Sequence, residues 1–430
     1  MRRVTGTLLG KTISKATRLR NARGGHALPG LVVGKVVPGY IKAMLQQLPD
    51  GIVIITGTNG KTTTTKMVVE LLEANGKRVL TNPTGSNMMR GIASTLTHQA
   101  KPSGKLAFDI AVFEMDEAYA SQLGKEIAPR WVLALNVSRD QLDRFGEVDT
   151  IARYITAAMA QATDGVITNA DDDRLRTFAQ TKLADGHQKV LYFGINPKLL
   201  KFFPRDNELV NVEADATLQE PSPQFTSQVE LVDFKDSQAS YNIDGKTYPV
   251  TLQVTGQHNF QNAAAAVTLV HAILPTVTPE KITQQLSEIR TAFGRGQAFQ
   301  LPDGSSLQLA LVKNPAGFRQ NLASYVDADT TVMVAINDNI ADSRDLSWLW
   351  DVDFSSLKQS QGVALTSGRR AVDMALRLSY DEIPVTNIEP DLHKALSVFS
   401  KLPDKKKVIL ASYTAMMRLH KLLEGMEKRS

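Results

Sequence analysis

The sequence of 430 residues contains no cysteine. A chain without thiols cannot form a disulfide framework, a thiolate zinc site or a cysteine nucleophile. Long apolar runs are also lacking, since none approaches the roughly 18 residues that span a bilayer or forms the core of a secretory signal. With 43% hydrophobic residues, the chain can form two or three domains with cores of their own. We therefore expect a globular protein that is located in the cytoplasm.

Acidic residues are absent from positions 1–35, which carry eight basic ones. Over the whole chain, Lys plus Arg (49) exceeds Asp plus Glu (44) only slightly, so the total charge does not indicate nucleic acid binding. We interpret residues 1–48 as a basic arm or helix. Two interpretations stay open: the arm contacts the anionic inner face of the plasma membrane, or it packs on the body with an ordinary solvated basic face.

Strand and helix patterns alternate after this arm. The β-branched run Ile52–Thr56 is flanked by glycines, and apolar residues recur at helical spacing from Lys61 to Glu73. Such alternation predicts an α/β fold with a mostly parallel, doubly wound sheet. The other predicted elements of this region are the strands 109–113, 131–136 and 165–169 and the helix 151–162.

The pattern changes around residues 196–228, which contain Pro, Asp and Gln and no cysteine. Period-two alternation follows in 228–234 and 241–254, which predicts a small inserted β unit, and helices are expected over 259–273 and 279–292. Phe293-Gly294-Arg295-Gly296 is typical of a hinge. We expect a central ATP-binding domain over 49–294 and a C-terminal Rossmann-like α/β domain over 295–430. The strands expected in the latter are 307–312, 331–336, 362–365 and 407–411, and its last helix is 413–423.

A phosphate-binding loop is predicted at Gly57-Thr58-Asn59-Gly60-Lys61-Thr62, between a strand and the first turn of a helix. Backbone N–H groups and the helix dipole at such a place face a polyphosphate. Lys61 would neutralise phosphate oxygens, and the Thr62 hydroxyl would bind Mg²⁺. The general pattern has a glycine where this chain has Ile55, and a plain glycine turn is the simpler alternative.

The short form of this loop resembles the loop of Mur ligases and folylpolyglutamate synthetases. That resemblance implies a Mg²⁺-binding glutamate at Glu114, an adenine-contacting segment at 256–262 and a nucleotide-binding hinge arginine at Arg295. The alternative for Glu114 is that it is an ordinary glutamate at the start of a helix, without a metal-binding role. The residues expected to bind ATP are Gly57, Thr58, Asn59, Gly60, Lys61, Thr62, Thr63, Asn259, Asn262, Arg295 and Asn314, with Thr62 and Glu114 as the Mg²⁺ ligands.

The C-terminal half distinguishes between these enzymes. Residues 313–318, 337–353 and 139–147 closely resemble the MurT family, the synthetase subunits of two-subunit lipid II isoglutaminyl synthases. The resemblance covers essentially the whole chain. Many members carry a four-cysteine zinc ribbon in the central domain, but residues 196–228 lack cysteine, so we expect no zinc and leave the role of this insert open.

The resemblance implies amidation of the α-carboxylate of D-glutamate in the stem peptide of lipid II, through an acyl phosphate, to give D-isoglutamine. It also implies a GatD-type glutaminase partner that supplies ammonia. A cysteine-free chain cannot form a thioester with glutamine, so composition separately requires either a partner or free ammonia. Lys61 and Glu114 are the expected catalytic residues of the ATP site.

Five aspartates lie close together between residues 338 and 353, and most are expected to be turn or cap residues. By the resemblance, Asp345 reaches the partner and orients its histidine, which completes a Cys-His-Asp triad across the two subunits. Trp348 and Trp350 are either anchors of that interface or core residues.

Three hypotheses stay open: the amidating subunit, a folylpolyglutamate-type ligase that adds an amino acid, and a non-catalytic nucleotide-binding module. Amide formation that depends on glutamine and a partner would select the first. ADP release stimulated by glutamate and a folate would select the second, and ATP binding without turnover the third.

Overall fold

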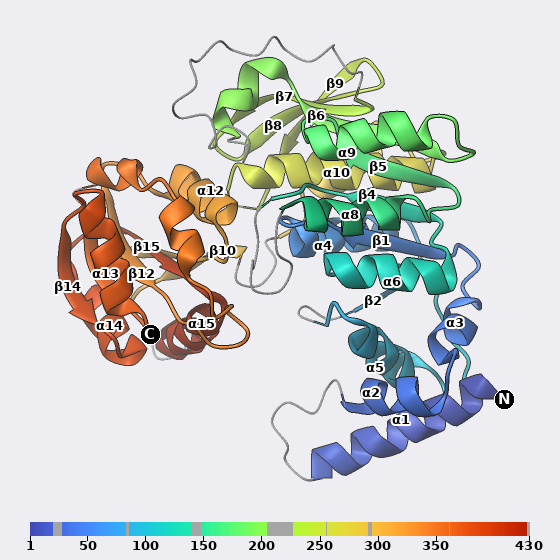
Figure 1. Cartoon of the computed structure of the whole chain (residues 1–430). Helices are drawn as coiled ribbons and strands as arrows, with labels where there is room; N and C mark the ends of the chain where they lie inside the picture. The colour runs from blue at the N-terminus through green and yellow to red at the C-terminus, as the bar shows by residue number, and fades with distance from the viewer. Residues whose placement is uncertain are drawn as a thin grey trace.

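The computed structural model describes residues 1–19, 28–82, 86–138, 148–203, 227–254, 256–290, 295–360 and 362–427. It contains two β-sheets, each covered by helices on both faces, and a group of helices near the N-terminus (Figure 1). In these ranges, no helix is both long and apolar enough to cross a membrane.

The larger sheet has the strand order β2-β3-β1-β4-β5-β6-β7-β8-β9 within the described residues. β2 to β7 pair in parallel, as the alternation of strands and helices predicted, whereas β7, β8 and β9 are antiparallel. The strands are β1 (Ile52–Thr56), β2 (Val79–Thr81), β3 (Ile110–Glu114), β4 (Trp131–Ala134), β5 (Gly165–Asn169), β6 (Lys189–Ile195), β7 (Val229–Lys235), β8 (Gln238–Ile243) and β9 (Lys246–Thr251).

β1 lies between β3 and β4, and all five of its residues are buried. Val53 and Ile55 face one hydrophobic core, and Ile52 and Ile54 face the other. Burial on both faces explains the continuous β-branched run in the sequence. Burial of each such side chain contributes roughly 1.5–3 kcal/mol to the free energy of unfolding.

Helices cover both faces of this sheet (Figure 1). One face packs against α4 (Lys61–Ala74), α10 (His258–Ile273) and α11 (Pro279–Leu286), and the other against α5 (Met89–Gln99), α6 (Glu117–Ile127), α8 (Val148–Met159) and α9 (Asp173–Phe178). A π-helical turn, η2 (Ala179–Leu183), and a 3₁₀-helix, η3 (Pro197–Phe202), flank β6.

Some predictions differ from the structure in detail. The β unit expected as an insert continues the main sheet as β7, β8 and β9. The helix expected over 279–292 is wrong at its end, because α11 stops at Leu286. Beyond it, Arg290 pairs with Gln253, and its carbonyl accepts a hydrogen bond from Lys66 Nζ (2.7 Å).

The second sheet has the order β10-β11-β15-β12-β13-β14, parallel except for the β10–β11 pair. Its strands are β10 (Arg295–Gln300), β11 (Ser306–Leu311), β12 (Thr330–Ala335), β13 (Val363–Ser367), β14 (Val385–Glu389) and β15 (Lys406–Ala411). α12 (Pro315–Tyr325) and α13 (Ala371–Tyr380) pack on one face, and α14 (Leu392–Phe399) and α15 (Tyr413–Glu427) on the other. Two short 3₁₀-helices, η5 (Ser347–Asp351) and η6 (Ser355–Lys358), follow β12.

The N-terminal arm forms α1 (Arg2–Leu19), α2 (Leu28–Val36) and α3 (Tyr40–Leu45). α1 contacts α2, α3 and α5, so the arm lies on the body as one of its two interpretations expected. The expected domain boundary after residue 294 adjoins 291–294, which lie outside the described residues. The domain limits therefore stay a proposal.

Candidate active site

The predicted phosphate loop leaves the carboxyl end of β1 and leads directly into α4. Gly57 has φ +132° and Gly60 has φ +87°. A Cβ atom would lie 3.0 Å from the backbone nitrogen of Asn136 at Gly57, and 2.2 Å from Asn262 Oδ1 at Gly60. Only glycine fits both the backbone conformation and the space, so these glycines set the path of the loop.

Asn136, which follows β4, holds this loop in place. Its side-chain oxygen accepts a hydrogen bond from the Asn59 N–H (2.9 Å), and its Nδ2 donates to the Asn59 carbonyl (3.1 Å). The Thr58 N–H donates to the Asn136 carbonyl (3.0 Å). The loop is thus fixed before any ligand arrives, and the first N–H groups of α4, which have no partner within the helix, lie at its end.

Lys61 is buried and forms an ion pair with Glu117. Its Nζ lies 2.8 Å from Glu117 Oε1 and also donates to the carbonyls of Gly57 and Thr58. Glu117 is the first residue of α6, immediately beyond the strand that ends at Glu114. The ammonium of Lys61 is therefore held at the loop by a carboxylate and by the backbone.

Lys313, which follows β11 of the second sheet, contributes to the same charge cluster, and its Nζ donates to the Thr58 carbonyl (3.2 Å). Burial favours the neutral form of Glu117, but the charges of Lys61 and Lys313 and the hydrogen bond from Lys61 outweigh it. The pKa of Glu117 consequently lies below its ordinary value. Glu117 is an anion that faces two lysines at the predicted phosphate site.

Thr62 and Glu114, the two predicted Mg²⁺ ligands, lie side by side. Thr62 Oγ1 donates to Glu114 Oε1 (3.1 Å), and both residues are buried. Asn82 fixes the Glu114 backbone, because it accepts from the Glu114 N–H (3.0 Å) and donates to its carbonyl (2.9 Å). A hydroxyl and a carboxylate are the hard oxygen donors that Mg²⁺ prefers, so these residues fit the ion.

In the part of the chain that the structure describes, no group of three or more His, Asp or Glu side chains is placed to hold a metal ion. A Mg²⁺ at Thr62 and Glu114 would therefore take its remaining ligands from water and from phosphate oxygens, as is usual for this ion. The residues 204–226 of the expected insert are outside the described ranges, as is the motif at 139–147.

The other predicted nucleotide-binding residues surround the loop. Asn262 donates from Nδ2 to Asn259 Oδ1 (2.9 Å), and it faces Gly60. From the second sheet, Asn314 Nδ2 donates to Asn59 Oδ1 (3.0 Å). Thr63 is buried in the first turn of α4. The Arg295 side chain lies outside the described part of the structure, so its predicted role is untested.

A small cavity of about 90 Å³ lies next to the loop, between residues of the two sheets and their helices. It is lined mainly by polar side chains, which include Asn59, Asn136, Asn169, Asp172, Gln261 and Gln320. Burial raises the pKa of Asp172. The hydrogen bonds that Asp172 accepts from the Val137 and Leu175 N–H groups lower this pKa, but burial outweighs them. The recess adjoins the loop through Asn59 and Asn136, and its volume is below that of pockets that enclose a whole ligand.

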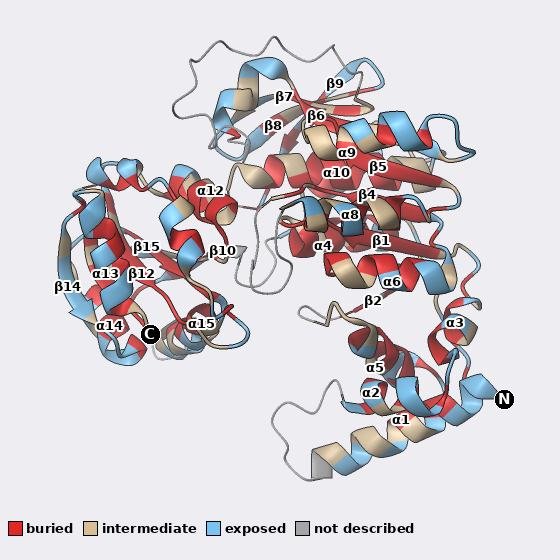
Figure 2. Cartoon of the chain, viewed as in Figure 1, coloured by how far each residue is buried: buried red, intermediate tan, exposed pale blue. Residues whose placement is uncertain are grey.

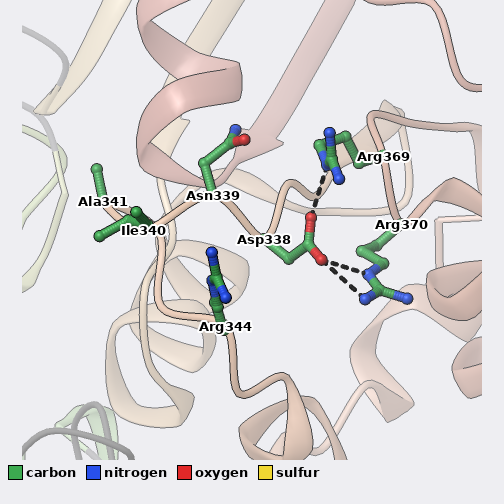
Figure 3. A pocket seen from close by; sticks show the side chains of 7 residues that line it. All are labelled: Asp338, Asn339, Ile340, Ala341, Arg344, Arg369 and Arg370. Carbon is green, nitrogen blue, oxygen red and sulfur yellow. Dashed lines mark hydrogen bonds and ion pairs between the residues drawn. The ribbon is translucent and has the colours of Figure 1, made fainter.

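The aspartates that follow β12 have different surroundings. Figure 3 shows Asp338 between Arg369 and Arg370, which both bond to it. This cluster and Arg344 line an open cavity of about 700 Å³. Asp342 is buried and accepts from the Thr414 N–H (2.7 Å), which ties the segment to α15. Both carboxylates hold the fold of the segment together.

Asp345 is half-buried and forms a turn with Ser347, the first residue of η5. Its two oxygens accept from the Ser347 N–H (2.8 Å) and from the Ser347 hydroxyl (3.0 Å). Each carboxylate oxygen has a further lone pair, so these bonds to Ser347 leave Asp345 able to accept another hydrogen bond. Trp348 is buried against Phe318, whereas Trp350 is 53% exposed and lies against Tyr380 and Arg377.

Sequence reasoning missed Glu117 as a partner of Lys61. The signal was present, because Glu117 lies three residues after Glu114, where the strand has ended and helix α6 begins. Lys313 was noted only as part of a motif. Its approach to Thr58 depends on the placement of the second sheet, which no local pattern gives.

Comparison with known proteins identifies the family that has this architecture. Residues 55–270 match the Mur ligase middle domain family, and residues 311–416 match the MurT ligase C-terminal family. Subunit MurT of the lipid II isoglutaminyl synthase (glutamine-hydrolyzing) of Staphylococcus aureus strain COL is 30% identical over 99% of both chains. The chain belongs to the MurT family of Mur ligases. The MurT subunit of Streptococcus pneumoniae strain ATCC BAA-255 / R6 is 32% identical over 93% of this chain and 92% of its own.

Among solved structures, the MurF ligase of Thermotoga maritima in complex with ADP has a TM-score of 0.67 at 16% identity. The likeness covers 94% of this chain and 85% of the MurF chain. It shows that this MurT-family chain has the Mur ligase fold, as the sequence predicted, with the phosphate loop on the first strand of the larger sheet.

Proposed function

We propose that this chain is the synthetase subunit of a glutamine-dependent enzyme that amidates the α-carboxylate of D-glutamate in the stem peptide of lipid II. Similarity to MurT subunits along nearly the full length of both chains supports this substrate class. The observation that carries the proposal for the ATP site is the meeting of the two sheets at the phosphate loop, through Lys313–Thr58 and Asn314–Asn59.

The proposed reaction has two steps. A carboxylate oxygen of the acceptor attacks the γ-phosphorus of ATP, the bond to ADP breaks, and an acyl phosphate forms. Ammonia then attacks the acyl carbon, phosphate leaves with the bonding electrons, and the nitrogen loses a proton to give the amide. In this scheme Lys61 and Lys313 offset the charge on the phosphates, and fixed charges of this kind need no reorganisation during the reaction.

Mg²⁺ would be held by the Thr62 hydroxyl and the Glu114 carboxylate. When bound, it screens the negative charge that separates an anionic acceptor from the terminal phosphate. Asn82 keeps Glu114 in register for this role through its two backbone hydrogen bonds. Asn259 and Asn262 would contact the rest of the nucleotide.

Ammonia would come from a GatD-type glutaminase subunit, since this chain has no thiol with which to hydrolyse glutamine. We assign Asp345 to the interface, where it would accept a hydrogen bond from the catalytic histidine of the partner subunit and fix its tautomer. The remaining lone pairs of its carboxylate support this role. Asp338 and Asp342, which hold the fold of their own segment, are poor candidates for it.

The proposal is tested by supplying the purified chain with ATP, Mg²⁺, lipid II and glutamine, with and without a GatD-type glutaminase. Mass spectrometry of the stem peptide should show conversion of the carboxylate to the amide only when the partner or added ammonium is present. Amide formation in the absence of both the partner and ammonium would contradict the proposal. ADP release that responds to glutamate and a folate, with lipid II left unchanged, would instead select the folylpolyglutamate-type alternative.

A further inference from the structure

The group of helices at the lower end of the molecule in Figure 1 carries no acidic residue. α1 contains five Lys or Arg residues, and α2, α3 and α5 contain one each. α1 and α2 both pack on α5, so the basic charge of the arm joins that of a distant segment. This end of the molecule therefore carries a positive charge that no carboxylate of these helices offsets.

The inner face of α1 is fixed against the body. Cβ atoms added at Gly6 and Gly10 would lie 2.3 Å from the Tyr40 ring and 2.4 Å from Thr97 Cγ2. The Thr7 hydroxyl and the Tyr40 hydroxyl are hydrogen-bonded (2.9 Å) and buried. α1 cannot rotate without breaking these close contacts, so the residues on its other side are held outward.

That outer side is apolar as well as basic. Met1, Val4 and Leu8 recur at helical spacing and are exposed, as are Leu28, Leu31 and Val36 of α2. Apart from the terminal Met1, these side chains are between 39% and 62% exposed. Figure 2 shows exposed residues on both helices. Arg2, Arg3 and Lys15 of α1 and Lys35 of α2 are also exposed.

We propose that α1 and α2 form a peripheral membrane-binding face whose ligand is a bilayer with anionic phospholipids. Exposed Leu and Val would enter the boundary between headgroups and acyl chains, while Arg and Lys contact the lipid phosphates. A polyanion such as nucleic acid would contact the basic residues but would not bury the exposed apolar side chains. Lipid binding does not require the proposed amidation, which it would serve by holding the chain where a lipid-linked acceptor lies.

The experiment is co-sedimentation of the full chain with vesicles of phosphatidylglycerol and phosphatidylcholine in equal parts, and with vesicles of phosphatidylcholine alone. Binding should require phosphatidylglycerol and weaken as salt is raised, because the Debye length falls to about 10 Å at 0.1 M and 3 Å at 1 M. Each basic residue near the surface changes the partition coefficient by roughly fivefold. Arg2→Gln with Arg3→Gln should therefore lower it on the order of tenfold or more.

Val4→Gln with Leu8→Gln tests the apolar half of the proposal and should lower the partition coefficient by about fivefold or more. Leu376→Gln is the matched control, because Leu376 is 55% exposed on α13, a helix of the other sheet. Val4, Leu8 and Leu376 have exposed side chains, whereas Arg2 lies near Gly39 and Arg3 near Gly104, so the melting temperature of every variant is compared with that of the wild type. That check separates lost binding from lost folding.

Three results would overturn the proposal. The first is that the chain binds neither kind of vesicle, and the second is that it binds both equally. The third is that the Val4 and Leu8 substitutions leave binding unchanged while the arginine substitutions abolish it. The last result would show attraction to any polyanion. Because no nucleotide, glutamine or partner is present, none of these results depends on whether the chain amidates lipid II.

Discussion

The ammonium of Lys61 lies 2.8 Å from the carboxylate of Glu117, and both side chains are buried. A nucleotide that recruits Lys61 to its phosphates must compete with this carboxylate or share the ammonium with it. In the chain without nucleotide, Glu117 provides the negative charge that Lys61 and Lys313 require. The pair links the stability of the free chain to its affinity for ATP.

Glu117→Gln keeps the shape of the side chain and removes its charge. We expect a less stable free chain, because breaking a buried ion pair by removing one partner costs on the order of 3 kcal/mol. Bound nucleotide should restore the lost charge balance. Addition of Mg²⁺ and ADP should therefore raise the melting temperature of the variant more than that of the wild type.

Calorimetry of both proteins with and without ADP gives the measurement, and an equal or smaller shift of the melting temperature in the variant would show that Glu117 does not compete with phosphate.

The pH dependence of the stability of the free chain has a defined sign. Since the pKa of Glu117 is lowered in the folded chain, the pair stabilises it above the ordinary carboxyl pKa. That contribution is lost as pH falls through the lowered value.

Lys61→Ala should reduce ATP-dependent amidation by about 10²-fold or more, since it removes a pre-organised charge. It also leaves Glu117 buried without its closest cation, so the single variant should melt at a lower temperature. Adding Glu117→Gln to Lys61→Ala should recover much of the stability and none of the activity. Recovered amidation in the double variant would contradict the role of Lys61.

Glu114→Ala should reduce the rate of amidation by a similar factor, because it removes a carboxylate that would bind Mg²⁺. Glu114→Asp keeps a carboxylate on a shorter side chain and should recover partial activity at raised Mg²⁺. The measurement is the rate of amide formation against Mg²⁺ concentration for the three proteins. Identical Mg²⁺ dependence in all three would remove Glu114 from the metal site.

Asn314 both caps α12, through the Gly317 N–H (2.7 Å), and donates to Asn59 on the phosphate loop (3.0 Å). Asn314→Ser keeps a capping oxygen and loses the contact with Asn59, whereas Asn314→Ala loses both. We expect both variants to lower kcat/KM for ATP by about fivefold, which is the effect of one hydrogen bond. Only the alanine variant should also lose about 1 kcal/mol of stability. Unchanged kcat/KM in the serine variant would show that the contact has no role in ATP use.

The elements that the sequence predicted well are those with the strongest local patterns. β1 and β5 have the expected limits because both are buried on both faces and end at polar or glycine residues. β14 was missed because it is an edge strand with mostly exposed residues, which leaves no alternation to read. β2 has only three residues, too few for a periodic pattern.

The candidate site was predictable as far as it follows from one sheet. Thr62 and Glu114 come together because β1 and β3 are parallel neighbours whose carboxyl ends meet at one edge. The pairing of Lys61 with Glu117 depends on side-chain direction, which spacing does not give. The contacts of Lys313 and Asn314 depend on how the second sheet lies against the first, a long-range arrangement that no short motif encodes.

Asp345 provides the sharpest test of the partner hypothesis. Asp345→Asn keeps an oxygen that can cap Ser347, so the segment and the complex should form as in the wild type. Hydrolysis of glutamine by the complex should nevertheless fall on the order of 10⁴-fold, because the amide no longer holds the partner's histidine in the required tautomer. Amidation driven by added ammonium should continue, since the phosphate loop belongs to the other sheet.

Asp353→Asn is the matched control for this substitution. Asp353 lies eight residues further along, is exposed, and accepts from the Ser355 N–H (2.8 Å) at the start of η6, much as Asp345 does at η5. Its substitution should change neither activity. Gel filtration must show that both variants bind the glutaminase, because a lost interface would also stop hydrolysis. If the Asp345→Asn complex assembles and hydrolyses glutamine at the wild-type rate, Asp345 only stabilises the turn before η5. Asp342 is then a weak substitute, because its carboxylate is already engaged by Thr414.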